Sequence, residues 1–380
     1  MKVLKWLGLT MIGLLVLVGV LVASILAWWR FGDWQARAVQ DVEFVHEAIL
    51  HHHPGPVDVE NPEFARLMEE AWNRAMPLAQ AARTAADHHA AINAYTDTFQ
   101  DGHLRVGFAD RVFAMMSSRR SGNPLTSGTS GVSITDNTAW VTITSFNERR
   151  TSIAELTEEI EARADDLRDL DRLVFDLRGN GGGSSAFARR IATAVWTAEV
   201  YRDWVPTSAA GVDWRVSPEN AAHVHGIAER NASRGRERQA AAWARLADRI
   251  DEAVIAGDDY VRQNFSAREI SRSAASPVTA QVVVITDSVC ASSCLDFMDM
   301  LMALPDVTHV GEETSSDTQY IDVRPLDLPS RTGRMSLPLK VYRGRLRPPG
   351  GTYVPAILTD AAALDAASLD ALLAATDADQ

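Results

Sequence analysis

The sequence contains little cysteine. Only Cys290 and Cys294 occur among its 380 residues, so a framework of disulfides cannot hold the fold together. The two residues are four positions apart, which suits one face of a helix but gives awkward geometry for a bridge. We therefore expect two small buried side chains, with a disulfide as the alternative.

Positive charge is also scarce. The chain has 37 Lys and Arg against 50 Asp and Glu, a formal net charge of −13. Nucleic-acid binding relies on cations that neutralise phosphates, so this balance excludes that class of partner. The acidic residues are spread along the chain, which favours solubility as their role. The length suits one large domain or two ordinary ones.

The N-terminus carries a long apolar run. From Trp6 to Trp29 no residue is charged, and Lys2 and Lys5 precede the run. A bilayer core needs about 20 apolar residues in a helix, and tryptophans at both ends match the membrane interfaces. We expect an uncleaved single-pass anchor in the inner (cytoplasmic) membrane, with everything after Arg30 on the periplasmic or extracellular side. A cleaved signal peptide is the alternative, although the run is longer than about 15 residues and the candidate cleavage sites are poor.

The rest of the chain changes from helical to alternating patterns. We expect an anchor at residues 1–31, a helical region at 32–118 that ends in an Asp-Gly-His element, and an α/β core at 119–380. Polar, Arg- and Ala-rich residues at about 207–275 read as a helical insertion. In the core, apolar strands alternate with helices, which indicates parallel pairing. Expected strands lie near residues 132–134, 140–143, 173–175, 281–286, 318–323 and 335–342, and expected helices at 153–167, from about 184, from about 291 and at 365–375.

Histidines occur in groups that invite a metal interpretation. Three lie at positions 51–53, two at 88–89, and His223 and His225 in a polar stretch. Consecutive residues of a helix cannot all face one ion, and histidines in a last turn interact well with the helix C-terminus. The other pairs have no cysteine or acidic ligands at a recognised spacing. We expect no metal and no cofactor.

Two strand-to-helix turns could build a site, because α/β sites form at such turns. The first ends in Gly181–Gly183, where glycines permit close approach to backbone N–H groups and a helix N-terminus favours developing negative charge. The Gly-Lys-Ser/Thr ending of a phosphate loop is missing. We therefore expect Gly182 to supply an oxyanion donor, with a purely structural turn as an even alternative.

The second turn, Asp287–Cys294, contains serines at the start of a helix. A serine there is usually only a cap, but this one follows a buried-looking strand and the N–H of Cys294 could be a second oxyanion donor. A hydroxyl nucleophile needs a base. Apart from the two lysines before the membrane run, the chain has only Lys340, so histidine is the more economical choice. His103 follows an Asp-Gly turn that could present its imidazole, whereas the rival His309 lies in an expected strand.

The combination of Asp101–His103, Asp176–Gly183, Ala291–Asp296 and Val310–Thr314 resembles peptidase family S41. The resemblance spans roughly residues 40–358 and implies a crotonase-like ββα core. The family nucleophile lies in a Ser-Ala-x-Glu pattern, which matches Ser293–Asp296 and favours Ser293 over Ser292. The resemblance is to the branch that uses a histidine base, because Asp317 stands where carboxy-terminal processing members carry a lysine. The interval between His103 and Phe175 is too short for a PDZ domain.

The resemblance implies acyl transfer with an acyl-enzyme intermediate and peptides or unfolded proteins as substrates. Ser293 would be the nucleophile, His103 the base, and Gly182 and Cys294 the oxyanion donors. A carboxylate should orient the imidazole; Asp317 is the first candidate, followed by Glu313 and Asp322. The alternatives are a non-catalytic peptide- or ligand-binding protein on the same fold and an esterase-type acyl hydrolase.

Overall fold

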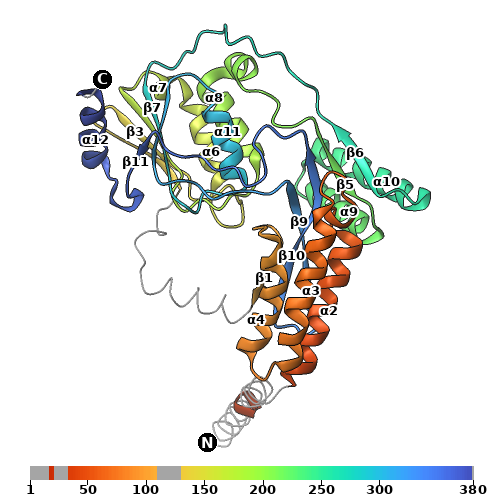
Figure 1. Cartoon of the computed structure of the whole chain (residues 1–380). Coiled ribbons are helices and arrows are strands. Elements are labelled where there is room, and N and C mark those ends of the chain that lie inside the picture. The colour runs from red at the N-terminus through yellow and green to blue at the C-terminus, as the bar shows by residue number, and fades with distance from the viewer. Residues whose placement is uncertain (1–16, 21–32, 109–129, 379–380) are drawn as a thin grey trace, which may run out of the picture. The chain divides into compact units, whose positions relative to one another are not determined.

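The computed structural model describes residues 17–20, 33–108 and 130–378 (Figure 1). The chain forms two compact units. The first unit comprises residues 1–112, 215–261 and 322–340, and the second comprises residues 113–214, 262–321 and 341–380. The expected anchor at residues 6–29 lies almost wholly outside the described residues. Among the helices that are described, none has the length and apolarity to cross a bilayer.

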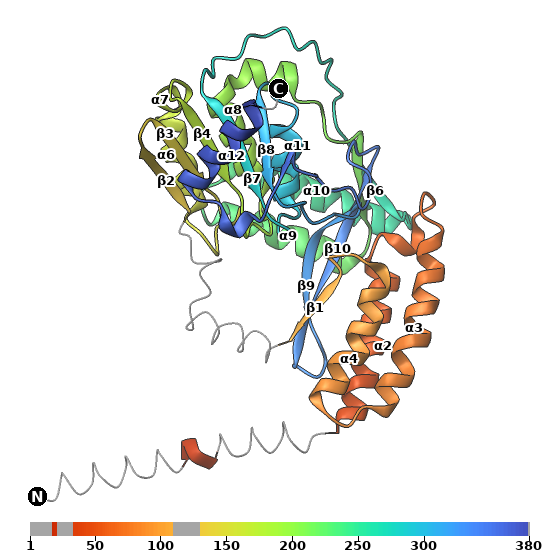
Figure 2. The same ribbon diagram turned by 60° about the vertical axis from the view of Figure 1, so that its left-hand side comes forward.

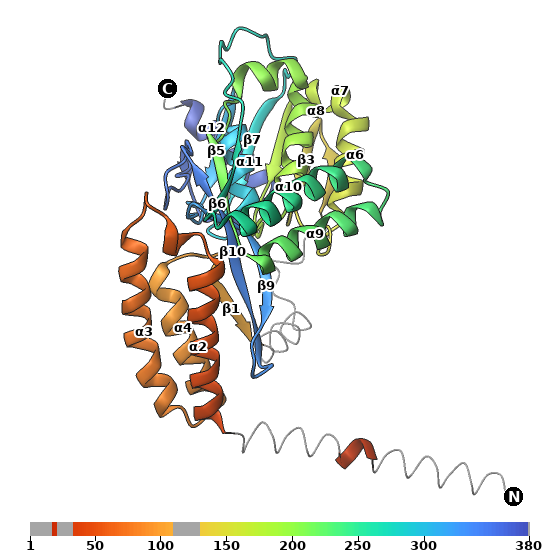
Figure 3. The ribbon, with the colours of Figure 1, turned by 90° about the vertical axis from the view of Figure 1, so that its right-hand side faces the viewer.

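Three helices begin the first unit: α2 (Trp34–His52), α3 (Glu63–Ala81) and α4 (Ala85–Thr96). In α2, Ala38, Val42, Val45 and Ile49 recur at helical spacing and are fully buried. Thr84 and the N3 residue of α4 form a capping box. The helices pack side by side (Figure 3) because each buries one apolar face against the others.

One of the grouped histidines of this unit, His88, is part of its packed core. α2 ends at His52 before the 3-10 turn η1 (Gly55–Val57), as the Pro-Gly break predicts. His88 of α4 is fully buried, and its Nε2 lies 2.8 Å from the Asp41 carboxylate of α2. The same carboxylate accepts the backbone N–H of Ser330 at 3.0 Å. A buried carboxylate is stable only when it is hydrogen-bonded, so this network is part of the core.

The remaining elements of the first unit follow later in the chain. A short turn, η2 (Asp97–Phe99), leads to β1 (Arg105–Phe108), which pairs antiparallel with β10 (Gly333–Arg343), Arg105 opposite Ser336. β9 (Tyr320–Asp327) also pairs with β10. Helices α9 (Pro218–Ala232) and α10 (Glu237–Ala256) pack side by side (Figure 3). Among the described residues, the chain passes between the units within β5 (Gly211–Arg215), β6 (Tyr260–Asn264), β9 and β10.

The second unit contains a six-stranded sheet of order β11-β8-β7-β4-β3-β2. All neighbours are parallel except β2 and β3. The sequence-based expectation of an α/β core with parallel pairing is confirmed. The strands are β2 (Gly131–Thr135), β3 (Thr138–Thr142), β4 (Arg172–Asp176), β7 (Gln281–Thr286), β8 (Val307–Gly311) and β11 (Ile357–Leu358).

Helices cover both faces of this sheet (Figure 2). Leu173 and Phe175 of β4 pack against one group of helices, whereas Val174 between them packs against the C-terminal helix on the other face, as the alternation of a strand requires. The first face carries α6 (Ile153–Ala162), α7 (Ala164–Arg168), α8 (Ser185–Trp204) and α11 (Ser293–Leu301), and the second carries η5 (Ala361–Ala363) and α12 (Ala366–Ala378).

Candidate active site

Ser293 is the first residue of α11, at the end of the turn that follows β7. It is 3% exposed. The preceding Ser292 has φ 57° and ψ −122°, a conformation that L-residues rarely adopt. Such strain persists only where the surrounding structure enforces it, and it is common at functional sites. The turn is therefore built to hold the side chain of Ser293 in one place.

The expectation of two free buried cysteines is wrong, because Cys290 and Cys294 form a disulfide with a Cα–Cα distance of 5.3 Å. The helix begins only at Ser293, so Cys290 lies in the turn and not one helical turn below Cys294. The reasoning from helical spacing fails for that reason. The bridge encloses Ser292 and Ser293 in a covalent loop.

The hydroxyl of Ser293 lies 3.3 Å from the Oγ of Ser185, the first residue of α8. Ser185 Oγ is in turn 2.6 Å from Asp296 Oδ2. Ser185 is placed as the donor in both contacts, because the carboxylate of Asp296 can only accept and the Ser293 oxygen also accepts from Ser185. Neither partner was predicted. Ser185 thus links the Ser293 hydroxyl to the Asp296 carboxylate.

Two arginines surround the carboxylates of this region. Arg345 lies 2.9 Å and Arg347 3.3 Å from Asp296. Both guanidinium groups also lie 3.5 Å from Asp317, which is 6% exposed. Asp317, the first candidate for orienting an imidazole, thus pairs with arginines of its own unit. Arg345 and Arg347 lie in the turn after β10, beyond Gly344 with its φ of 57°, so no strand periodicity in the sequence indicated that they share a face.

The glycine-rich turn follows β4, the parallel neighbour of β7, so the two turns emerge at the same edge of the sheet. Gly182 has φ +94°, and a Cβ there would lie 2.7 Å from the Cβ of Ser292. A Cβ on Gly183 would lie 2.2 Å from the carbonyl carbon of Phe146. Real side chains do not tolerate such distances, so glycine is required at both positions.

The predicted oxyanion donors are engaged within the chain. The Gly182 N–H donates to Asn180 Oδ1 at 2.9 Å, and the Cys294 N–H donates to the Ala291 carbonyl at 3.1 Å. In the part of the chain that the structure describes, the N–H groups of Gly181 and Gly183 have no such acceptor. Use of Gly182 and Cys294 as donors stays a prediction that requires these bonds to be shared or exchanged.

The polar side chains of the Asp176–Gly183 motif have a structural role here. Arg178 is bidentate to Asp176 at 2.8 and 2.6 Å and donates to the carbonyls of Ala361 and Leu364. Asn180 also donates to the Ile143 carbonyl at 2.9 Å. These polar side chains tie the turn to the sheet and to the C-terminal segment.

His103 belongs to the first unit, in a turn between η2 and β1. Its backbone N–H donates to Asp101 Oδ1 at 2.8 Å, and its Nδ1 lies 3.6 Å from the same oxygen. The expectation that the Asp-Gly turn holds this histidine outside a helix is confirmed, and its side chain is 17% exposed. Because Ser293 belongs to the second unit, its pairing with His103 stays a prediction.

The other candidates have structural partners. The Nε2 of His309 is 2.7 Å from Thr286 Oγ1, and burial lowers the pKa of His309 to about 4. Glu313 accepts the hydroxyl of Thr352 at 2.6 Å. Asp322, in the first unit, pairs with Lys340 at 2.7 Å. His309 is thus a neutral hydrogen-bonded residue of the core.

A cavity of about 770 Å³ lies beside Ser185 and Asp296, wholly within the second unit. Its wall is mostly apolar and aromatic, with Tyr201, Phe265 and Leu346 among the lining residues. Ligand pockets are concave and apolar, with a few polar groups that fix orientation. Because Ser185 contacts both the cavity and the Ser293 hydroxyl, the cavity adjoins the candidate nucleophile.

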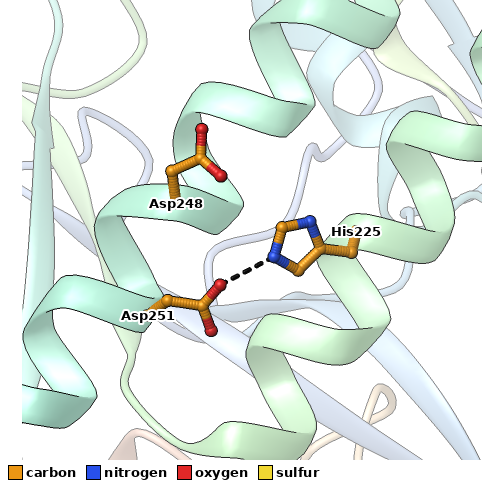
Figure 4. Close-up of side chains that lie close together, drawn as sticks. All are labelled: His225, Asp248 and Asp251. Carbon is orange, nitrogen blue, oxygen red and sulfur yellow. Dashed lines mark hydrogen bonds and ion pairs between the residues drawn. The ribbon is translucent and has the colours of Figure 1, made fainter.

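One group of described residues has the composition of a metal site. His225 of α9 and Asp248 and Asp251 of α10 have potential ligand atoms within 4.8 Å of one another (Figure 4). His225 Nε2 is 2.7 Å from Asp251, and the side chains of both residues are substantially exposed. A hydrogen bond between the packed helices α9 and α10 accounts for the contact of His225 with Asp251.

Comparisons with known proteins agree with this geometry. The sequence model of peptidase family S41 matches residues 137–351, more than half of the chain. The chain belongs to peptidase family S41. It is therefore a serine-type peptidase, and the family supports peptide or protein substrates.

No curated protein matches the sequence. Among solved structures, mature CPAF superposes with a TM-score of 0.54 at 9% identity, covering 86% of this chain and 94% of that one. Mature CPAF complexed with lactacystin gives a TM-score of 0.51 at 9% identity over 86% and 95%. The photosystem II D1 C-terminal processing protease gives 0.40 at 10% identity over 86% and 94%. At these identities only the fold is shared, and that statement rests on CPAF.

Proposed function

We propose that this S41 peptidase, on a crotonase-like core, cleaves peptide bonds outside the cytoplasm by Ser–His acyl-enzyme chemistry. His103 takes the proton of Ser293, the freed oxygen attacks the substrate carbonyl, and backbone N–H groups of the glycine-rich and serine turns stabilise the oxyanion. Water then releases the acyl group. A negative charge that develops at these turns also meets the N-termini of α8 and α11.

One observation carries the nucleophile assignment. Ser293 is held on a strained, disulfide-closed turn, and its hydroxyl is hydrogen-bonded beside a large cavity. A serine that merely caps a helix accepts a backbone N–H of the first turn, whereas the hydrogen bond described for Ser293 Oγ is with Ser185. A structural role explains neither the strain nor the position beside the cavity.

We further propose that residues 6–29 anchor the chain in a membrane and that the peptidase lies on the periplasmic or extracellular side. The charge-free length of this run supports the anchor. The Cys290–Cys294 disulfide supports the compartment, because disulfides persist in oxidising environments. Reporter enzymes fused after residue 380 test the orientation. We expect an alkaline phosphatase fusion to be active, because this enzyme is active only outside the cytoplasm. Activity of a fused reporter that works only in the cytoplasm would show the opposite orientation.

The central test compares wild type with Ser293→Ala and Ser292→Ala. We expect Ser293→Ala to lower cleavage of unfolded protein by at least about a thousandfold and to abolish labelling by a fluorophosphonate. Ser292→Ala puts a methyl side chain on the same strained backbone, and we expect this variant to keep the reactive hydroxyl of Ser293. Labelling that survives Ser293→Ala and disappears in Ser292→Ala would move the nucleophile by one position.

The base is tested separately with His103→Gln. Loss of turnover with an unchanged melting temperature is expected, together with loss of the rise in rate as the base deprotonates between about pH 5 and 8. Hydrolysis of activated esters without cleavage of any peptide would favour the esterase alternative.

A further inference from the structure

The charges around the cavity are unevenly compensated. Its two lining carboxylates are already neutralised: Asp296 by Arg345 and Arg347, and Asp299 by Arg347 at 2.9 Å and the Tyr353 hydroxyl at 2.6 Å. The cavity therefore presents no free negative charge from these two residues.

Two other lining arginines, Arg189 and Arg268, have no carboxylate partner among the described residues. Arg268 is held in place nonetheless: it donates to the Val205 carbonyl at 2.9 Å and lies 5.5 Å from the ring centre of Tyr201. These contacts leave most of its five N–H donors available. The wall thus carries two guanidinium groups that no carboxylate of the described residues neutralises.

Arg189 is placed with respect to the candidate nucleophile by the helix that carries it. It follows Ser185 by four residues on α8, and residues four apart lie about 5–6 Å from each other on one helical face. Both line the cavity, and Ser185 contacts Ser293. The neighbouring Arg190 is different, because it is bidentate to Glu161 at 2.8 and 2.6 Å and does not line this cavity.

We propose that this cavity binds a carboxylate of the peptide substrate, carried on an apolar stem, through Arg189 and Arg268. The proposal rests on the proposed function and names its substrate class: peptides with an acidic group close to the cleaved bond. The apolar wall receives the stem, and guanidinium groups pair with carboxylates through two parallel hydrogen bonds. The carboxylate belongs either to a Glu side chain or to the C-terminus of the peptide.

The experiment uses one fluorogenic peptide in four forms: Glu or Gln next to the cleaved bond, each with a free or an amidated C-terminus. We expect kcat/KM to be about tenfold higher for the form that carries the relevant carboxylate, as a charge-assisted hydrogen bond provides. The Glu/Gln pair and the acid/amide pair distinguish the two sources. Equal kcat/KM within both pairs would overturn the proposal while leaving the peptidase function intact.

Variants of the lining arginines then test whether the cavity causes the preference for carboxylate peptides. In Arg189→Gln and Arg268→Gln we expect the ratio of kcat/KM for the carboxylate and neutral forms to fall towards one. Arg190→Gln is the matched control and should keep the wild-type ratio. A ratio that survives in the double variant, with a wild-type melting temperature, would refute the assignment.

Binding measurements distinguish the carboxylate preference of the cavity from the peptidase activity. Fluorescence anisotropy with Ser293→Ala protein measures the affinity for labelled carboxylate and neutral peptides without any cleavage. A carboxylate preference in binding that Arg189→Gln abolishes would support the cavity even if no peptide were cleaved. Equal affinities for the carboxylate and neutral peptides would contradict the proposed carboxylate site even if cleavage were efficient.

Discussion

The two turns that meet at the edge of the sheet are held by different means. The turn after β4 is fixed by glycines that allow backbone contact and by side chains that bond the sheet and the C-terminal segment. The turn after β7 is fixed by a disulfide and a strained Ser292. The first turn thus has no reactive side chain and serves as a support, whereas the second presents a hydroxyl.

We expect the largest effect for a substitution in the glycine-rich turn after β4. Gly183→Ala places a Cβ against the Phe146 backbone at a φ of +148°. Strain and overpacking together predict a loss of about 4 kcal/mol in the free energy of unfolding. Gly181→Ala, where a Cβ meets nothing within 4 Å, is the control for urea denaturation. Equal midpoints for the two variants would show that the close approach is unnecessary.

The stability of the turn after β7, which carries Ser293, should depend on its disulfide. The Cys290→Ala/Cys294→Ala double variant should lose about 2 kcal/mol of stability, the value for so short a loop. Because the bridge encloses Ser293, peptidase activity should fall by more than the fraction of protein that unfolds in the assay. Wild type treated with dithiothreitol should match the double variant; full activity in the reduced protein, assayed well below its melting temperature, would contradict this.

Ser185→Ala should have a smaller effect, on activity and not on folding. It removes the hydroxyl that donates to the Ser293 oxygen and to Asp296. We expect kcat to fall about tenfold with little change in KM. Ser184→Ala is the control, because that exposed neighbour contacts neither group. Restoration of kcat by Ser185→Thr would identify the hydroxyl as the cause.

The smallest effect concerns pH. His309 supports the end of β7 through Thr286, and burial lowers its pKa from 6.5 to about 4. Protonation therefore favours the unfolded chain: the contribution of His309 is complete above pH 6.5 and decreases as the pH falls towards 4. His309→Gln should flatten this part of the stability–pH curve. An unchanged slope, measured by denaturation from pH 7 to pH 4, would exclude the residue as its cause.

The periodicity of the sequence predicted the elements of the core well. The strand expected at residues 281–286 is β7 with the same bounds, and the helix expected near 291 begins at Ser293. Local patterns are decisive there because apolar strands are buried on both faces. The regions expected at 32–118 and about 207–275 contain helices, yet parts of both belong to one unit, which no local pattern reveals.

The site was only partly accessible from sequence. Motif resemblance selected Ser293, but not Ser185 or the arginine pairs of Asp296, since those contacts join segments that are about 50–110 residues apart. The disulfide was missed because it depends on where the helix starts. Contacts of this kind follow from the assembled sheet and not from spacing along the chain.

The bonds from Arg178 to the carbonyls of Ala361 and Leu364 have a consequence for the end of the chain. Residues after 360 also shield Val174, Val283 and Ile285 from water through Leu364, Leu369 and Leu373. A cut ahead of Ala361 would strip one side of the sheet and release the arginine that steadies the glycine-rich turn. A peptidase that trimmed its own tail there would inactivate itself.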